Sequence, residues 1–337
     1  METQTDNRSG VTTMRAVVQD AYGDTAEVLR LERIARPQPG PGEVLVRVQA
    51  AGVDRGVWHL MAGRPYAVRL AIGLRAPRSR VRGAEFAGTV EAVGAGVRTV
   101  APGNEVFGTG SGSFAEYVVA PEGKVARRPA ALTPVQAAAV PVSASTALQA
   151  VRDHAHVQPG QRVLVIGASG GVGTFAVQIA KAFGAEVTGV CSTAKVDLVR
   201  SIGADHVVDY QQADITDHAR PYDVVLDIGG DRPLRQLRQV LTPRGTLVIV
   251  GGEGGGRWLG IGRQLRAALL SPFVGQKLGF FINRENAADL VVLAGLVESG
   301  GVTPAVDRTF PLAEAAAAVT HMADGHARGK VVVEVSR

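Results

Sequence analysis

A glycine-rich turn in the middle of the chain has the residue types of a phosphate-binding loop. A short β-branched run, residues 163–166, leads into the turn, and residues 174–183 have the pattern of a helix. Gly170 allows the backbone to approach a pyrophosphate, and Gly173 allows the helix to pack closely on the strand. The helix N-terminus then offers free N–H groups to the phosphates. The turn reads A-x-G-x-x-G, and we expect it to bind a dinucleotide through Ala168, Gly170, Gly171, Val172 and Gly173.

The residues after the next predicted strand, 186–191, indicate which dinucleotide the turn binds. An NAD site places an acid about 20 residues past the glycines to hold the ribose 2′-hydroxyl. Here Ser192, Thr193 and Lys195 follow the strand, and two hydroxyls with a cation suit a 2′-phosphate. The sequence therefore favours NADPH. Two alternatives stay open: Lys195 is a solvated residue at a helix start, or Asp197 takes the place of the acid if the turn is offset.

Length and composition indicate a two-domain globular protein. The chain has 337 residues, of which 46% are hydrophobic and 20% are charged. No apolar run reaches the roughly 18 residues of a membrane span, so we expect no membrane association. Residues 1–13 are polar and predict a disordered leader rather than a secretory signal. The single cysteine excludes an intrachain disulfide and a thiolate-rich zinc site, and cytoplasmic location is the expectation.

The charge distribution does not indicate a nucleic-acid partner. The net charge is +5, but basic and acidic residues are interspersed along most of the chain. Residues 69–82 are the exception, with five arginines, no acid and almost no aromatic side chain for base stacking. This segment is either a solvated loop or a surface that attracts an anionic substrate or carrier protein.

The chain contains three regions of different pattern. Residues 14–128 have short strands and glycine turns, which predicts a β-rich, partly barrel-like domain. Residues 133–283 alternate strand and helix, which predicts a parallel, doubly wound sheet. Residues 302–337 return to strands around a helix and rejoin the first domain. Ligands of such sheets lie beyond the carboxyl ends of the strands. This rule selects the four turns at 167–173, 192–195, 227–230 and 250–252, and with them Gly229, Gly251 and Gly252 as cofactor contacts.

Several segments together resemble one superfamily. They are PGEVLV at 41–46, VEAVG at 90–94, PGNEVFG at 102–108, GSFAEYV at 112–118, AAVP at 138–141, the glycine turn and GKVV at 329–332. The chain resembles the medium-chain dehydrogenases/reductases, in their zinc-free quinone oxidoreductase-like branch. The resemblance implies an α/β fold in which a Rossmann NADP-binding domain, residues 133–302, is inserted in a GroES-like catalytic domain, residues 14–132 plus 303–337.

The resemblance also implies further cofactor contacts and a homodimer. Tyr210, Phe281 and Lys330 look like cofactor contacts, although Tyr210 could simply end a strand, and Phe281 could lie in the core or in a dimer interface. The homodimer is expected to form through the edge strands of the nucleotide domain, near residues 246–252 and 280–282.

The positions that hold zinc in related enzymes lack zinc ligands here. Asp54, Ala84 and Val142 stand where such relatives have Cys, His and Cys. A tetrahedral site cannot be assembled from these residues, so we expect no metal. Without a Lewis acid, hydride transfer is easiest to an acceptor that delocalises the developing charge. The absence of ligands therefore favours a quinone or an α,β-unsaturated carbonyl as acceptor.

Three side chains in the first domain are candidate proton donors. Tyr66 is a phenol, His59 titrates near neutral pH, and Asp54 is able to donate only if it is buried and neutral. Each also has a plain structural interpretation, and water is able to supply the proton instead. The leading hypothesis is an NADPH-dependent quinone or enone reductase. The alternatives are a ketone, aldehyde or enoyl-thioester reductase, and a non-catalytic NADPH-binding protein.

Overall fold

The computed structural model describes residues 12–24, 26–217, 220–251 and 260–336, in two compact units. Unit 1 comprises Met1–Val142, Glu285–Ala294 and Val306–Arg337, and unit 2 comprises Ser143–Arg284 and Gly295–Ala305. The predicted boundary lay after residue 132, before helix α3 (Pro134–Ala138). That helix packs on strands of unit 1 and groups with them. Among the described residues, no helix is both long and apolar enough to cross a membrane.

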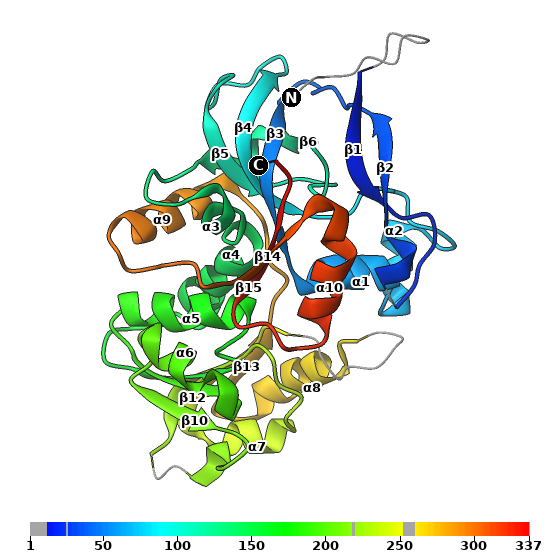
Figure 1. Ribbon diagram of the computed structural model, residues 1–337. Coiled ribbons are helices and arrows are strands. Elements are labelled where there is room, and N and C mark those ends of the chain that lie inside the picture. Colours follow the sequence, from blue (N-terminus) through cyan, green and yellow to red (C-terminus); the bar gives the residue numbers. More distant parts are fainter. Residues whose placement is uncertain (1–11, 25, 218–219, 252–259, 337) are drawn as a thin grey trace. The chain divides into compact units, whose positions relative to one another are not determined.

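Unit 1 is built on a seven-stranded sheet in which the strand order is β14-β15-β3-β4-β5-β7 and β6 also pairs with β3. Its strands are β3 (Glu43–Val53), β4 (Glu85–Val93), β5 (Glu105–Thr109), β6 (Tyr117–Pro121), β7 (Val125–Arg127), β14 (Val306–Pro311) and β15 (Lys330–Glu334). A separate ladder pairs β1 (Thr13–Val18) with β2 (Arg30–Ala35). The red C-terminal strand β15 lies beside the blue β3, so the end of the chain rejoins the first domain as predicted (Figure 1).

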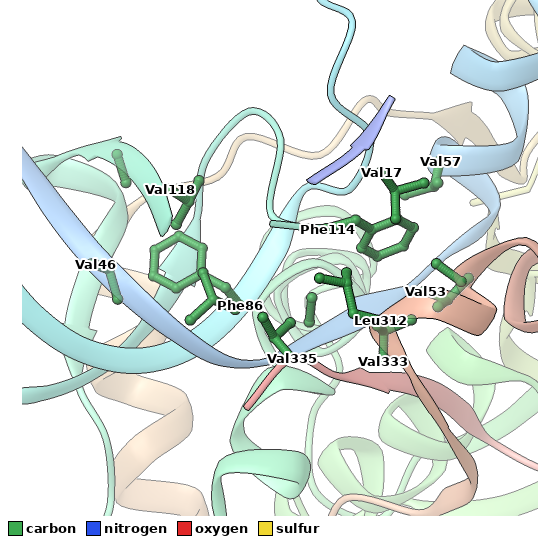
Figure 2. Close-up of a cluster of buried hydrophobic side chains, with 14 of the residues drawn as sticks. Val17, Val46, Val53, Val57, Phe86, Phe114, Val118, Leu312, Val333 and Val335 are labelled. Carbon is green, nitrogen blue, oxygen red and sulfur yellow. The ribbon is translucent and has the colours of Figure 1, made fainter. Parts of the chain in front are cut away.

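The core of unit 1 forms where the alternating side chains of these strands meet the short helices. Phe86, Phe114 and Val333 are all fully buried there, together with Val57 of α1 (Arg55–Ala62) and Leu312 (Figure 2). The other helices of this part of the chain are α2 (Arg69–Ile72) and α10 (Ala315–Ala323). The core joins residues from both ends of the chain, so the C-terminal segment is an integral part of this domain.

Unit 2 is built on a six-stranded parallel sheet of order β10-β9-β8-β11-β12-β13. Its strands are β8 (Arg162–Ile166), β9 (Glu186–Cys191), β10 (His206–Asp209), β11 (Tyr222–Asp227), β12 (Leu241–Ile249) and β13 (Lys277–Phe280). This order is that of a Rossmann sheet, as predicted. The helices of this unit are α5 (Gly171–Ala182), α6 (Val196–Ser201), α7 (Leu234–Gln239) and α8 (Gly262–Leu270). Two further helices, α4 (Pro141–Gln149) and α9 (Ala287–Glu298), span residues assigned to both units.

Candidate functional site

The glycine turn connects β8 to α5 and leaves the start of the helix open. Gly170 is the N-cap of α5 and has no side chain to satisfy the first N–H groups of the helix. A Cβ at Gly170 would meet only the Gly167 carbonyl, at 3.5 Å, whereas a Cβ at Gly173 would lie 2.0 Å from that same oxygen. The two glycines therefore have different functions. Gly173 permits the helix to pack on the turn, whereas Gly170 leaves the first N–H groups of the helix uncovered.

The turn tolerates alanine where the motif usually has its first glycine. Ala168 is fully buried, and its Cβ would lie 3.0 Å from a Cβ built on Gly189 of β9. Since Gly189 has no side chain, the Ala168 methyl group has room beside that strand. Gly171 and Val172 are partly exposed in the first turn of α5. The cradle fits a pyrophosphate, and the predicted contacts of these residues with a cofactor stay predictions.

At the end of β9 the structure adds an acid that the sequence analysis overlooked. The hydroxyl group of Thr193 lies 2.5 Å from Asp209 Oδ2 and 2.8 Å from Gln211 Oε1. Asp209 ends the neighbouring strand β10 and is in register with Cys191. Sequence reasoning looked for the acid only after β9. The parallel sheet would have predicted Asp209, because the carboxyl ends of neighbouring strands meet at one edge.

Ser192, Lys195 and Tyr210 are the other contacts predicted near this turn, and these contacts stay predictions. Ser192 and Lys195 are partly exposed at the end of β9, and Lys195 makes at least one interaction within the protein. Tyr210 directly follows β10 and is 53% exposed. Burial raises the pKa of the Cys191 thiol to about 11, so this side chain is an inert part of the strand.

The turns after β11 and β12 lie beside the glycine turn. A Cβ on Gly167 would approach the Gly229 nitrogen to 2.8 Å, and a Cβ on Gly251 would lie 2.0 Å from the Ile228 carbonyl. These close approaches require glycine at both positions. Gly229 is exposed and Gly251 is partly exposed, whereas Gly252 and Trp258 lie outside the described residues.

A buried acid–base pair fixes α8 near these turns. Asp227 ends β11, is fully buried, and lies 2.7 Å from the Arg263 guanidinium of α8. The Gly230 N–H also stabilises the Asp227 carboxylate. Burial raises the pKa of Asp227 to about 6, despite the neighbouring Arg263. Gln264 adds a second attachment by donating from Nε2 to the Gly251 carbonyl at 3.1 Å. The sequence analysis found neither α8 nor this pair.

Phe281 follows the edge strand β13 and stacks on a histidine. Its ring lies 4.2 Å from the His154 ring, at an interplanar angle of 18°. Phe280 instead packs against the core of unit 2. The cofactor contact predicted for Phe281 stays a prediction, and the ring already has a partner within its own unit.

Asp54, the first candidate proton donor, caps a helix. Its Oδ1 accepts a hydrogen bond from the Val57 N–H at 3.1 Å, which makes Asp54 the N-cap of α1. Its Oδ2 is buried with no hydrogen-bond partner among the described residues. This hydrogen bond satisfies one of the free N–H groups at the start of α1, so the carboxyl group of Asp54 already has a structural role.

His59 and Tyr66 lie on the same segment. His59 Nδ1 is 3.0 Å from the Arg64 carbonyl, which is able only to accept. The Nδ1 atom therefore carries a proton, and the neutral ring has its second proton-binding position at Nε2. Tyr66 begins a short 3₁₀ turn, and the Arg69 guanidinium lies 4.9 Å from its ring centre. The segment that contains these two side chains thus consists of helix α1 and a short 3₁₀ turn.

Glu85 and Lys330 form a second buried pair, in unit 1. Lys330 is 1% exposed, and its ammonium group contacts Glu85 Oε1 and donates to the Val53 carbonyl at 3.2 Å. Glu85 Oε2 accepts from the Val142 N–H at 2.9 Å. The ammonium group of Lys330 is therefore engaged within unit 1. The prediction that Lys330 contacts the cofactor stays untested.

The residues at the expected metal position do not fit zinc. Glu85, the strongest carboxylate candidate, has one oxygen on the Lys330 ammonium and the other on a backbone N–H. Asp54 is occupied in capping α1. Within the described part of the chain, no group of three or more His, Cys, Asp or Glu side chains is placed to hold a metal ion. These donors do not assemble a tetrahedral zinc site among the described residues, and the expectation of no metal stays a prediction.

The arginine-rich segment 69–82 is more structured than a solvated loop. Arg69 Nε donates to a carbonyl at the C-terminal end of α1 at 2.9 Å. Arg80 pairs with Asp20 at 2.5 Å, and Arg82 is only 5% exposed. The two other arginines of the segment are exposed. Attraction of an anionic substrate or carrier stays a prediction that those two side chains would have to support.

Comparison with known proteins places this geometry among oxidoreductases. A model described as an alcohol dehydrogenase GroES-like domain matches residues 40–130, and one described as a zinc-binding dehydrogenase matches residues 202–333. The chain is 33% identical to the mitochondrial NAD(P)H oxidoreductase RTN4IP1 of Bos taurus, over 96% of this chain and 90% of that one. It is 31% identical to the chloroplastic quinone-oxidoreductase QR1 of Triphysaria versicolor, over 95% and 98%. A mycobacterial protein solved with NADPH is 27% identical and superposes with a TM-score of 0.81, over 96% and 100%.

Proposed function

Because the chain belongs to the medium-chain dehydrogenase/reductase superfamily, in its quinone oxidoreductase-like branch, we propose that it transfers hydride from NADPH to a quinone or an α,β-unsaturated carbonyl. The observation that carries the proposal is the open glycine turn, whose Gly170 leaves the start of α5 accessible. The relatives' names support the two parts of the proposal: one uses NAD(P)H and the other reduces quinones.

The preference for NADPH rests on the turn after β9. Ser192 supplies a hydroxyl group and Lys195 a cation, and this turn has no acid of its own until Asp197. A charge-assisted hydrogen bond contributes about 1.5–3 kcal/mol, which corresponds to roughly ten- to a hundredfold in affinity. Bound NADPH would supply the hydride. The chain's own residues would hold the pyrophosphate at the glycine turn and the 2′-phosphate at Ser192 and Lys195.

The acceptor side of the proposal depends on unit 1. The donor set around Glu85 does not fit a metal, so charge that develops on the acceptor would have to be delocalised within it or met by hydrogen bonds. Quinones and enones delocalise this charge. Tyr66 and His59 remain the proposed proton donors, and Asp54 is less suited because it caps α1.

The proposal includes cytoplasmic location and a homodimer that pairs through β13, the edge strand of the unit 2 sheet.

An acceptor panel tests the reaction. We expect NADPH oxidation with quinones and enones and little with isolated ketones, unchanged by a chelator. Turnover with ketones or enoyl thioesters alone would favour a reductase of a biosynthetic pathway. Tight NADPH binding without turnover on any acceptor would favour a non-catalytic NADPH-binding protein.

The charge reversal Lys195→Glu tests the cofactor assignment. We expect it to raise the KM for NADPH by at least about tenfold and to change the KM for NADH far less, because only NADPH carries the 2′-phosphate. Steady-state kinetics with both cofactors measure the difference. Equal effects on the two cofactors would rule out this role of Lys195.

A further inference from the structure

The carboxylate of Asp209 lies beside the residues proposed to hold the 2′-phosphate. It reaches them from β10, where Asp209 is in register with Cys191 at the end of β9. The distance from Asp209 Oδ2 to the hydroxyl oxygen of Thr193 is 2.5 Å. Asp209 Oδ1 accepts from the Gln211 N–H at 3.0 Å, which holds the carboxylate in place.

Both donors of Thr193 point into this network. Its single hydroxyl proton faces Asp209 Oδ2 and Gln211 Oε1, and its N–H donates to Gln211 Oε1 at 3.3 Å. A threonine hydroxyl has one proton, so it cannot donate to a phosphate while it donates to this carboxylate. Thr193 was predicted as a contact of the cofactor, but in this arrangement it has no donor left for a 2′-phosphate.

The charges around the turn are mixed. Lys195 and Arg200 lie close enough to Cys191 to lower its pKa, whereas Asp209 acts in the opposite direction on the same thiol. Arg200 in turn lies 3.7 Å from Asp197, whose side chain is fully exposed. A 2′-phosphate at this turn would therefore meet the attraction of Lys195 and the repulsion of Asp209 together.

We propose that Asp209 is a specificity-determining residue that limits the preference for NADPH, because its carboxylate occupies the Thr193 hydroxyl and opposes a 2′-phosphate. The inference rests on the proposed function. The chain then uses NADH as well as NADPH, and the ratio between the two is set by Lys195 and Asp209 in opposition.

The substitution Asp209→Asn tests this inference because it removes the charge and keeps the shape. Asparagine retains an acceptor for Thr193, and its size is nearly that of aspartate. Isothermal titration with 2′,5′-ADP and with 5′-AMP separates the 2′-phosphate contribution from the rest of the cofactor, and needs no acceptor. We expect Asp209→Asn to tighten 2′,5′-ADP by roughly three- to tenfold, the effect of one unit charge a few ångströms away in water, and to leave 5′-AMP within about twofold.

The matched control is Asp197→Asn, which removes an exposed carboxylate from the same region. It should change neither ligand by more than about twofold. Equal changes for both ligands in Asp209→Asn, or a loss of 5′-AMP affinity, would overturn the inference, and the latter would make Asp209 the acceptor of a ribose hydroxyl. Failure of the unsubstituted protein to bind either ligand would contradict the proposed function instead.

Discussion

Among the described residues, two carboxyl groups are completely buried, Glu85 in unit 1 and Asp227 in unit 2, and their partners come from different kinds of element. Both oxygens of Glu85 have partners, the Lys330 ammonium and the Val142 N–H. Asp227 has an ion pair with Arg263 of α8, and the Gly230 N–H also stabilises its carboxylate. Burial raises the pKa of Glu85 to about 7 and that of Asp227 to about 6, so neither charge is fully compensated by its partners.

The difference reflects what each pair holds together. Lys330 opens β15 and Glu85 opens β4, so their contact joins two strands that flank β3 in the sheet. Arg263 is in the first turn of α8, so its contact with Asp227 attaches a helix to the end of a strand. The first pair is part of the sheet of unit 1. The second holds a helix beside the turns at the carboxyl edge of unit 2.

The largest expected effect comes from Lys330→Met. It removes the cation that lowers the pKa of Glu85, and we expect the free energy of unfolding to fall by about 3–5 kcal/mol at pH 8, above the pKa of about 7 that Glu85 has beside Lys330. Urea denaturation followed by circular dichroism measures the loss. The double variant Glu85→Gln/Lys330→Met should regain most of it, since no charge is then left uncompensated. A loss below about 1 kcal/mol in the single variant would show that the pair contributes little.

The next largest effect is expected in the pH dependence of stability. Burial raises the pKa of Asp227 from 3.8 to about 6, so the native protein binds this proton more tightly than the unfolded chain. The resulting stabilisation is complete below about pH 4 and is lost as the pH rises through 6. A pKa difference of about two units between the native and unfolded states corresponds to roughly 3 kcal/mol in the free energy of unfolding.

The substitution Asp227→Asn isolates this contribution. Burial also raises the pKa of Glu85 to about 7, so both carboxyls act in the same direction in the unsubstituted protein. Denaturation between pH 4 and pH 8 should show a smaller decline in stability for Asp227→Asn than for the parent. Parallel curves for the two proteins would mean that Asp227 does not titrate in this range.

The smallest effect is expected for Arg263→Met. Because Asp227 keeps the Gly230 N–H and its partner Arg263 is less buried than Lys330, the loss of Arg263 should cost less than the loss of Lys330, about 1–3 kcal/mol at pH 8. Denaturation at pH 8 and at pH 5 checks the mechanism, since the cost should shrink at the lower pH. A cost equal to that of Lys330→Met at both pH values would remove the distinction between the two pairs.

The sheet of unit 2 was easier to predict from the sequence than the contacts between charged side chains in either unit. Strand β9 has the predicted bounds, because a β-branched run between turn residues is a local signal. Helix α9 was missed because its residues are apolar on nearly every side, which leaves no 3.6-residue period to detect.

The site was predictable only where its parts are close in the sequence. The glycine turn and the turn after β9 lie within one βαβ unit, so spacing alone identified them. Glu85 and Lys330 are 245 positions apart, and no sequence pattern indicates that they meet. Asp209 is the intermediate case. It lies at the end of β10, and its relation to Thr193 follows from the alignment of parallel strands.

The position of β15 beside β3 also has a consequence for biosynthesis. Val53 and Lys330, which are joined by a hydrogen bond, are 277 positions apart, so β3 leaves the ribosome long before its partner is translated. The residues of the parallel sheet, by contrast, are synthesised in one continuous stretch, from β8 to β13. We therefore expect the parallel sheet of unit 2 to be completed first during translation. Until β15 is synthesised, the part of β3 that pairs with it has an exposed edge, which chaperones would need to protect.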